Sequence, residues 1–434
     1  MNNLFASHLV KNLLLLVGEN PLPNYVAARL LLEKGGTPYL IHTVDTEREA
    51  FQLKEVLDDE RGDTGFEPAQ LKSLEQYESD AYRIQTEVGE LVKCLPAGRI
   101  GLNYTGGTKP MAVHAYRGVL NTTSKESEPV FSYLDPRRLK LCIDRQDGKR
   151  TRISVRPEDL SVSLKTIFRL HGRLWSTEPR QDPIYAGLSS ALAQVMSEEE
   201  TATAWLAWLH QSFWDGNGHL EQAAKPIKKN GKGRDWTSKS KLKQLIFPLE
   251  KMPKLVREQF PKSLLTEDGH ALSMEAVLKD GAFRKLKNYC EWLDGLWLEH
   301  HVLNELGIIA ESAGLSEYGM SFKVPLEGTR DGFEFDVAFT YGYQLFAISC
   351  TTENINRGLC KSKLLEAYVR ALQMGGQEAR IALVCGLNEP ESLEAELADL
   401  VSKQQIRVFG RQQLPRLADE ISRWIAENDA ELKR

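Results

Sequence analysis

The chain has 434 residues, of which 42% are hydrophobic and 26% are charged. This balance is typical of a soluble globular protein with sizeable cores and excludes a collagen-like, mucin-like or wholly disordered chain, while the length allows roughly two to four domains. The 55 Lys and Arg residues against 60 Asp and Glu residues give a net charge of −5, so the overall charge does not point to nucleic acid or to an anionic membrane.

Residues 1–150 alternate apolar strand-like runs with amphipathic helix-like runs. The strand-like runs are Leu13–Gly18, Pro38–Val44 and the strand and turn of Ile100–Lys109, and the helix-like runs are Tyr25–Gly35, a polar segment from Glu47, and Met111–Leu120. This order predicts a parallel, doubly wound α/β sheet. The runs Pro129–Asp135 and Leu139–Asp144 predict a hairpin that closes this first domain.

The longest strongly apolar run near the start, Leu13–Val17, is far shorter than the roughly 20 residues that a membrane span needs. No basic segment with a small-residue cleavage site precedes it. The six cysteines include no CxxC pair and lie mostly in apolar stretches, which favours reduced, structural thiols. We therefore expect a cytoplasmic protein with no membrane span and no zinc site.

Residues 151–285 show helical patterns, such as Thr201–Phe213, and few convincing strands, so we expect a mainly helical middle region. Within it, the segment Lys225–Lys243, here called the basic strip, carries eight basic residues and one acidic residue, with Trp236 among them. Clustered Lys and Arg contact phosphates, and an aromatic ring can stack on an unpaired base, so the basic strip is a candidate nucleic-acid surface. The alternative is an ordinary solvated loop.

Residues 286–434 return to an α/β pattern. The expected elements are a helix at Gly295–Leu306, strands at Phe333–Thr340 and Tyr343–Thr351, a helix at Lys361–Gln373, a strand at Arg380–Gly386, and a last helix, strand and helix. Glu299 lies on the first of these helices, and Glu334 and Asp336 lie two apart on the first strand. Their side chains share one strand face, where two carboxylates repel each other unless they are solvated or bound to a cation.

A possible ligand-binding loop lies in GLNYTGGTKPMAVHAY, which begins at Gly101. Gly106 and Gly107 would let a ligand approach the backbone, the helix N-terminus supplies unpaired N–H groups, and Lys109 adds a positive charge. The spacing is neither Walker A nor GxGxxG, and an ordinary tight turn is the alternative. The loop Gly18–Asn24 follows the first strand, and both loops would open at the carboxyl ends of the strands, where α/β sheets bind ligands.

These two loops, with the acidic residues near the other end of the chain, resemble the CARF-domain proteins of type III CRISPR systems. The resemblance is closer to the branch in which a CARF domain is fused to a PD-(D/E)XK-type nuclease, and it says little about the middle of the chain. It implies a Rossmann-like CARF domain in residues 1–150, a helical middle region in 151–285, and a restriction-endonuclease-like α/β domain in 286–434.

The resemblance also implies a ligand. CARF domains form homodimers that bind cyclic oligoadenylate in a two-fold pocket, and cyclic tetra-adenylate is the usual activator of the nuclease branch. Carried over by position, the ligand-binding residues of this chain are Asn20, Thr105, Gly106, Gly107, Thr108 and Lys109.

A PD-(D/E)XK-type site holds Mg²⁺ or Mn²⁺ on carboxylates, and the metal activates water and neutralises charge on the scissile phosphate. This chain departs from the pattern, because Ser349 and Thr351 stand where Glu-x-Lys is expected. Either the nuclease is inactive, or a lysine and a carboxylate have moved to the following helix; an ordinary solvated helix face is the alternative for those residues. The implied catalytic residues are Glu299, Glu334, Asp336, Lys361, Lys363 and Glu366, with Asp336, Glu366 and Glu299 as metal ligands.

The leading functional hypothesis is a homodimeric, cyclic-oligoadenylate-activated, metal-dependent nuclease that cleaves DNA, RNA or both in antiviral defence. A second hypothesis keeps the sensor but treats the nuclease domain as inactive, so that the basic strip binds DNA in a ligand-controlled regulator. A third is a metabolic α/β enzyme that uses an ordinary mononucleotide at the TGGTK loop. Its weakness is that no general-base histidine or GxSxG motif accompanies the loop.

Overall fold

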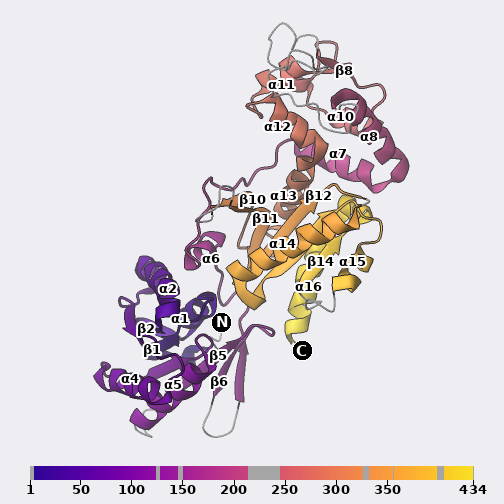
Figure 1. The fold of residues 1–434 in the computed structure, drawn as a ribbon. Helices are drawn as coiled ribbons and strands as arrows, with labels where there is room; N and C mark the ends of the chain where they lie inside the picture. The colour runs from indigo at the N-terminus through magenta and orange to yellow at the C-terminus, as the bar shows by residue number, and fades with distance from the viewer. Residues whose placement is uncertain are drawn as a thin grey trace.

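The computed structural model (Figure 1) describes residues 4–123, 128–144, 150–213, 245–325, 332–354, 356–397 and 405–433. The basic strip lies outside these residues. The described chain contains two large β-sheets, each covered by helices, and a mainly helical segment between them in sequence, so the protein is α/β, as predicted. No helix within these ranges is long and apolar enough to cross a membrane.

The first sheet has the strand order β3-β2-β1-β4-β5-β6-β7. Its strands are β1 (Val10–Leu16), β2 (Leu32–His42), β3 (Gln70–Ser73), β4 (Ile100–Asn103), β5 (Val130–Asp135), β6 (Lys140–Asp144) and β7 (Arg150–Ser154). The strands from β3 to β5 are parallel, and β6 and β7 continue the sheet antiparallel. The predicted closing hairpin is confirmed as β5 and β6, and β7 adds a further strand to it.

Helix α1 (Leu22–Leu31) is shorter than the sequence predicts. The apolar pattern indicated a helix as far as Gly35, but β2 already begins at Leu32. Gly35 has a φ of +75°, which is outside the helical region, and two successive glycines weaken a helix. The chain instead bends there, where the pairing of β1 with β2 shifts register.

Helices cover both faces of the first sheet, which explains why β1 is a continuous apolar run. Leu13 and Leu15 pack under α1 and α2, whereas Leu14 and Leu16 pack under α4 and α5. The bounds of these helices are α2 (Glu47–Asp59), α4 (Ala81–Cys94) and α5 (Lys109–Thr122). The carboxyl ends of the parallel strands therefore emerge between two helical layers.

The middle of the chain is mainly helical in its described residues. Its elements are α6 (Leu164–Leu170), α7 (Ala186–Ser197), α8 (Glu199–Phe213), α10 (Lys254–Gln259), α11 (Met274–Asp280) and α12 (Leu286–Glu291), with a short hairpin of β8 (Ile246–Pro248) and β9 (Ala271–Ser273). One apolar core that contains Trp205, Trp292 and Phe346 joins α7 to α12 with one face of the second sheet.

The second sheet has the strand order β10-β11-β12-β13-β14. Its strands are β10 (Glu317–Val324), β11 (Phe333–Tyr341), β12 (Gln344–Thr351), β13 (Arg380–Cys385) and β14 (Ile406–Phe409). Strands β10 to β12 are antiparallel, and β12 to β14 are parallel. Helices α13 (Trp297–Ile309) and α16 (Leu417–Lys433) pack on one face, and α14 (Arg357–Gly375) and α15 (Pro390–Leu397) pack on the other.

The N-terminal and C-terminal units meet at the C-terminal end of α14. One continuous apolar core contains side chains of the first sheet, α6 and α14, and Figure 1 shows α14 running across the second sheet toward the N-terminal unit. The short turn η5 (Gly376–Glu378) follows α14 directly. Its first residue lies against Asn20, since a Cβ on Gly376 would be 2.0 Å from Asn20 Nδ2. The domain boundaries at 150 and 285 stay predictions.

Candidate functional site

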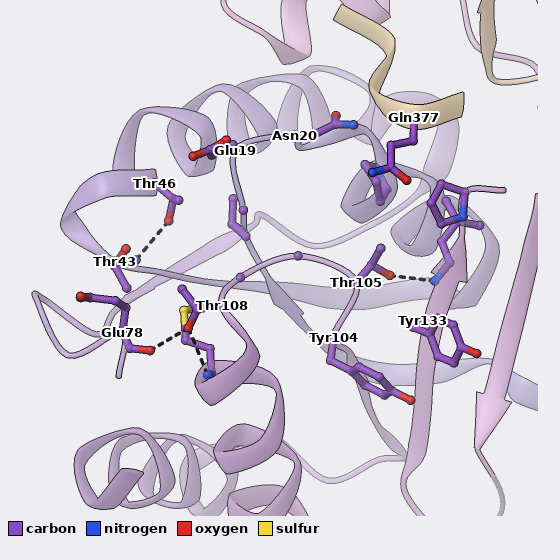
Figure 2. A pocket seen from close by; sticks show the side chains of 18 of the residues that line it. Glu19, Asn20, Thr43, Thr46, Glu78, Tyr104, Thr105, Thr108, Tyr133 and Gln377 are labelled. Carbon is purple, nitrogen blue, oxygen red and sulfur yellow. Dashed lines mark hydrogen bonds between the residues drawn. The ribbon is translucent and has the colours of Figure 1, made fainter. Parts of the chain in front are cut away.

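A cavity of about 650 Å³ lies at the carboxyl ends of the parallel strands of the first sheet. This volume is within the roughly 300 to 1,000 Å³ that is usual for small-molecule sites. Figure 2 shows the loops after β1 and β4 around it. Five predicted ligand residues line the cavity, namely Asn20, Thr105, Gly106, Gly107 and Thr108. The sixth, Lys109, is exposed at the first residue of α5 and lies outside this lining.

Glycines are required where these two loops touch. A Cβ on Gly106 would lie 2.3 Å from the Leu16 carbonyl oxygen, and one on Gly18 would lie 2.9 Å from the Gly107 nitrogen. Gly107 also has a φ of +72°, a region that disfavours other residues. The glycine pair therefore joins the two loops, and its substitution would disturb the cavity itself.

The two threonines differ in what they can offer a ligand. Thr108 Oγ1 accepts a hydrogen bond from the Met111 N–H at 3.3 Å and donates one to the Glu78 carbonyl at 2.7 Å, so its proton is already used. Thr105 Oγ1 accepts from the Leu134 N–H at 2.8 Å. This bond leaves the Thr105 proton for a ligand acceptor such as a phosphate oxygen.

The sequence did not reveal several lining residues. Tyr104 and Tyr133 line the cavity with ring centroids 5.6 Å apart, and such rings can stack on bases. Gln377 and Glu378 line it from η5, in the C-terminal unit. Tyr104 directly precedes the TGGTK loop, so that motif could have indicated it. No local signal connects η5 with the first strands.

The cavity lining is acidic. Among the lining residues that the structure describes, Glu19, Asp45, Glu78 and Glu378 are carboxylates and none is Lys or Arg. Phosphates would therefore meet N–H and O–H donors in this lining, while the carboxylates suit a ligand that also brings donors of its own. A nucleotide does so, because it carries ribose hydroxyls and, in adenine, an amino group.

Glu378 differs from the other three carboxylates because it is buried. Its side chain is 1% exposed, and its Oε1 has no hydrogen-bond partner among the described residues. Burial raises the pKa of Glu378 to about 7, although its own backbone N–H and the charge of Arg380 oppose the shift. The position therefore favours a Glu378 carboxyl that is protonated or that gains a hydrogen-bond partner.

Replacing Glu378 with Gln should stabilise the ligand-free protein above neutral pH. The folded-state pKa lies above the ordinary 4.5, so the folded state keeps a proton that the unfolded chain releases, and the wild type loses stability as pH rises from 4.5 to about 7. The expected gain above pH 7 is at most about 3 kcal/mol. Denaturant unfolding at pH 5 and pH 8 measures it, and an equal gain at both pH values would contradict the explanation.

A second group of predicted residues gathers between β11, β12, α13 and α14. Asp336 Oδ2 accepts hydrogen bonds from the Cys350 backbone N–H at 2.7 Å and from the Ser349 hydroxyl at 3.0 Å. Ser349 stands where the resemblance to PD-(D/E)XK-type nucleases predicts a glutamate. In this protein it holds Asp336 in place and supplies no carboxylate.

The carboxylates of this group influence one another. Burial, followed by the charges of Asp336 and Glu334, raises the pKa of Glu299 well above its ordinary value. Burial also raises the pKa of Glu334, and it raises that of Asp336, with a smaller contribution from Glu366. The structure therefore brings the four predicted carboxylates into one electrostatic cluster, whose repulsion a nearby positive charge would relieve.

The two candidate lysines of α14 have different partners. Lys363 Nζ donates to the Cys350 carbonyl at 3.2 Å, and its charge lowers the pKa values of Glu299 and Asp336 against the effect of burial. Lys361 forms an ion pair with Glu396 of α15. Because residues two apart on a helix point about 200° apart, only Lys363 joins the carboxylate cluster.

The donor chemistry of the cluster suits a hard divalent cation, because such ions take carboxylate oxygens. The mutual repulsion of Glu299, Asp336 and Glu366 also favours a cation. Within the described ranges, however, no three Asp, Glu, His or Cys side chains are grouped closely enough to hold a metal ion. A cation would have to draw the exposed Glu366 toward Asp336, so the structure offers candidate ligands without a preformed ligand shell.

No protein-family model and no curated protein sequence matches the chain. Among solved structures, the protein VC1899 from Vibrio cholerae is similar with a TM-score of 0.63 and 16% identity, and the match covers 96% of this chain and 98% of that one. Can2 from Sulfobacillus thermosulfidooxidans, in complex with cyclic tetra-adenylate, is similar with a TM-score of 0.62 and 15% identity over 95% and 99% of the two chains. The chain shares its fold with both over nearly its whole length.

Proposed function

We propose that this protein is a cyclic-oligoadenylate-activated, divalent-metal-dependent nuclease of type III CRISPR defence. The observation that carries the proposal is the single helix α14, which joins a nucleotide-sized cavity in the N-terminal unit to a carboxylate and lysine cluster in the C-terminal unit. The fold shared with Can2, whose structure contains cyclic tetra-adenylate, supports the same activator here.

In this proposal the N-terminal unit is a CARF-type sensor. Tyr104 and Tyr133 stack on adenine rings, Thr105 donates its hydroxyl proton to a phosphate oxygen, and Lys109 attracts the phosphates from outside the cavity lining. Two copies of the chain face each other and enclose one cyclic tetra-adenylate, as the resemblance to CARF proteins implies. The acidic lining supports a ligand with amino and hydroxyl donors over a simple anion.

The C-terminal unit is a PD-(D/E)XK-type nuclease whose lysine has moved to α14. Asp336, Glu366 and Glu299 would hold Mg²⁺ or Mn²⁺, which would supply an activated water and neutralise phosphate charge. Lys363, whose Nζ donates to the Cys350 carbonyl, lies near Asp336, where it stabilises the negative charge that develops on the scissile phosphate. Ser349 orients Asp336, and Glu334 adds negative charge on the same strand face.

The second candidate is a cyclic-oligoadenylate-responsive regulator that binds nucleic acid and has an inactive nuclease domain. This regulator is favoured by one observation: within the described residues, no three Asp, Glu, His or Cys side chains are grouped closely enough to hold a metal ion. The position of Lys363 favours the active enzyme, because its Nζ donates to the Cys350 carbonyl and so supplies a lysine next to the position where the usual motif is broken.

Cleavage assays on DNA and RNA, with and without cyclic tetra-adenylate and a divalent ion, test the proposed function. Ligand-dependent cleavage supports the nuclease. Ligand binding without cleavage under any metal condition supports the regulator, and the basic strip then becomes its predicted DNA contact.

A further inference from the structure

One wall of the ligand cavity belongs to the C-terminal unit. Gln377 and Glu378 of η5 line the cavity together with the loops after β1 and β4, and Figure 2 shows Gln377 projecting from the C-terminal ribbon toward it. Asn20 touches this wall, because its Nδ2 lies against Gly376, while its Oδ1 is 3.2 Å from His171 Nε2. A ligand in the cavity therefore meets both units of the chain.

The backbone of η5 is tied to the C-terminal unit. The Glu378 carbonyl accepts hydrogen bonds from Gln344 Nε2 at 3.0 Å and from Arg380 Nη1 at 2.9 Å. The Gln377 carbonyl accepts from Gln405 Nε2 at 2.8 Å. The turn is therefore held by β12, β13 and the segment before β14, while Gln377 and Glu378 line the cavity of the N-terminal unit.

The Glu378 carboxyl lacks a partner that its position requires. Its Oε1 is buried and unpaired among the described residues, and an unpaired buried acceptor is costly. Glu378 is a lining residue of the cavity, so a ligand donor in the cavity lies next to this buried side chain and can pair with it once the carboxyl turns toward the ligand. An adenylate brings two such donors, the amino group of adenine and the 2′-hydroxyl of ribose.

We propose that Glu378 accepts a hydrogen bond from one of these donors of the bound adenylate, so that the ligand is held between the N-terminal loops and η5. The inference rests on the proposed function and adds a contact from the nuclease side of the molecule. Helix α14 has 19 residues, a length of about 28 Å, and continues directly into η5. The contact at Glu378 therefore acts on the same helix that carries Lys363 and Glu366.

The test measures ligand affinity of the intact protein by calorimetry. The ligands are cyclic tetra-adenylate, its 2′-deoxy analogue, and the cyclic tetramer of purine riboside, which lacks the amino group. The principal variant is Glu378→Met, which keeps the side-chain volume and removes both oxygens, and Glu378→Leu, which also removes both oxygens, serves if the first variant unfolds early. Glu391→Met removes one exposed carboxylate at the start of α15, in the C-terminal unit but outside the cavity lining, and is the matched control.

We expect the wild type to bind one of the two analogues about tenfold or more weakly than cyclic tetra-adenylate, and the analogue affected identifies the donor. Glu378→Met should bind that analogue and cyclic tetra-adenylate equally, whereas Glu391→Met should keep the wild-type difference. The contact is overturned if the wild type binds all three ligands equally, or if Glu378→Met keeps the difference.

The link to α14 has its own readout, which is cleavage at saturating cyclic tetra-adenylate. Stimulation of cleavage should fall about tenfold or more in Glu378→Met, and full stimulation would overturn the link while leaving the contact. A wild type that fails to bind cyclic tetra-adenylate would reject the proposed function itself, and that result is distinct from a wild type that binds all three ligands equally.

Discussion

Replacing Asp336 with Asn should abolish nucleic-acid cleavage without weakening the fold. The amide oxygen of Asn can still accept the hydrogen bonds from the Cys350 N–H and the Ser349 hydroxyl, so the local geometry is retained. The negative charge that would hold the divalent ion is lost, and we expect a fall of about a thousandfold or more in the rate of cleavage. Initial rates on plasmid DNA with saturating metal and cyclic tetra-adenylate measure the effect.

Stability distinguishes a chemical role of Asp336 from a structural one. Burial raises the pKa of Asp336, so its charge opposes folding, and neutral Asn should leave the free energy of unfolding unchanged or higher at neutral pH. The affinity for cyclic tetra-adenylate should also be unchanged. Wild-type cleavage by a well-folded Asp336→Asn protein would remove Asp336 from the site.

Lys363→Met should lower the rate of cleavage about a hundredfold, while Lys361→Met should change it by less than about twofold. Only Lys363 lies beside the Cys350 carbonyl and near Asp336, where the proposed mechanism needs a charge to stabilise the reacting phosphate. Methionine keeps most of the side-chain length and removes the charge in both variants. Single-turnover rates with saturating ligand provide the comparison.

The two variants are a matched pair, because each replaces one lysine of α14 with methionine and so removes one positive charge. The ion pair of Lys361 with Glu396 is partly exposed, and such pairs contribute little to stability. Equal losses in the two variants would indicate a general effect of positive charge on substrate binding. No loss in Lys363→Met would contradict a lysine moved to α14 and would favour the inactive nuclease domain.

The first sheet was predictable because its strands and helices are short, local patterns. The run of β1 is apolar throughout because both of its faces are buried, and the pattern of α5 starts at the helix cap Thr108. The end of α1 was not predictable from apolar periodicity, since Leu32 continues the helical pattern but pairs with Val10 in the sheet. Tertiary pairing decided that boundary.

The sites were predictable only in part. Strand periodicity places Glu334 and Asp336 on one face, and the structure agrees, because in β11 they alternate with the buried Phe333, Phe335 and Val337. The choice between Lys361 and Lys363 needed the packing of α14 on β12, which no sequence spacing specifies. The part of the cavity wall that η5 forms could not be predicted from the sequence for a similar reason. It brings Glu378 next to loops that lie far from it in sequence.

The most direct test of the central claim is one cleavage experiment on the wild-type protein. Supercoiled plasmid, single-stranded DNA and RNA are incubated with Mg²⁺ or Mn²⁺, and each reaction is run without ligand, with adenosine monophosphate and with cyclic tetra-adenylate. We predict cleavage of at least one substrate only when cyclic tetra-adenylate and the metal are both present. Cleavage that is unchanged by cyclic tetra-adenylate, or no cleavage with either metal, would contradict an oligoadenylate-activated nuclease.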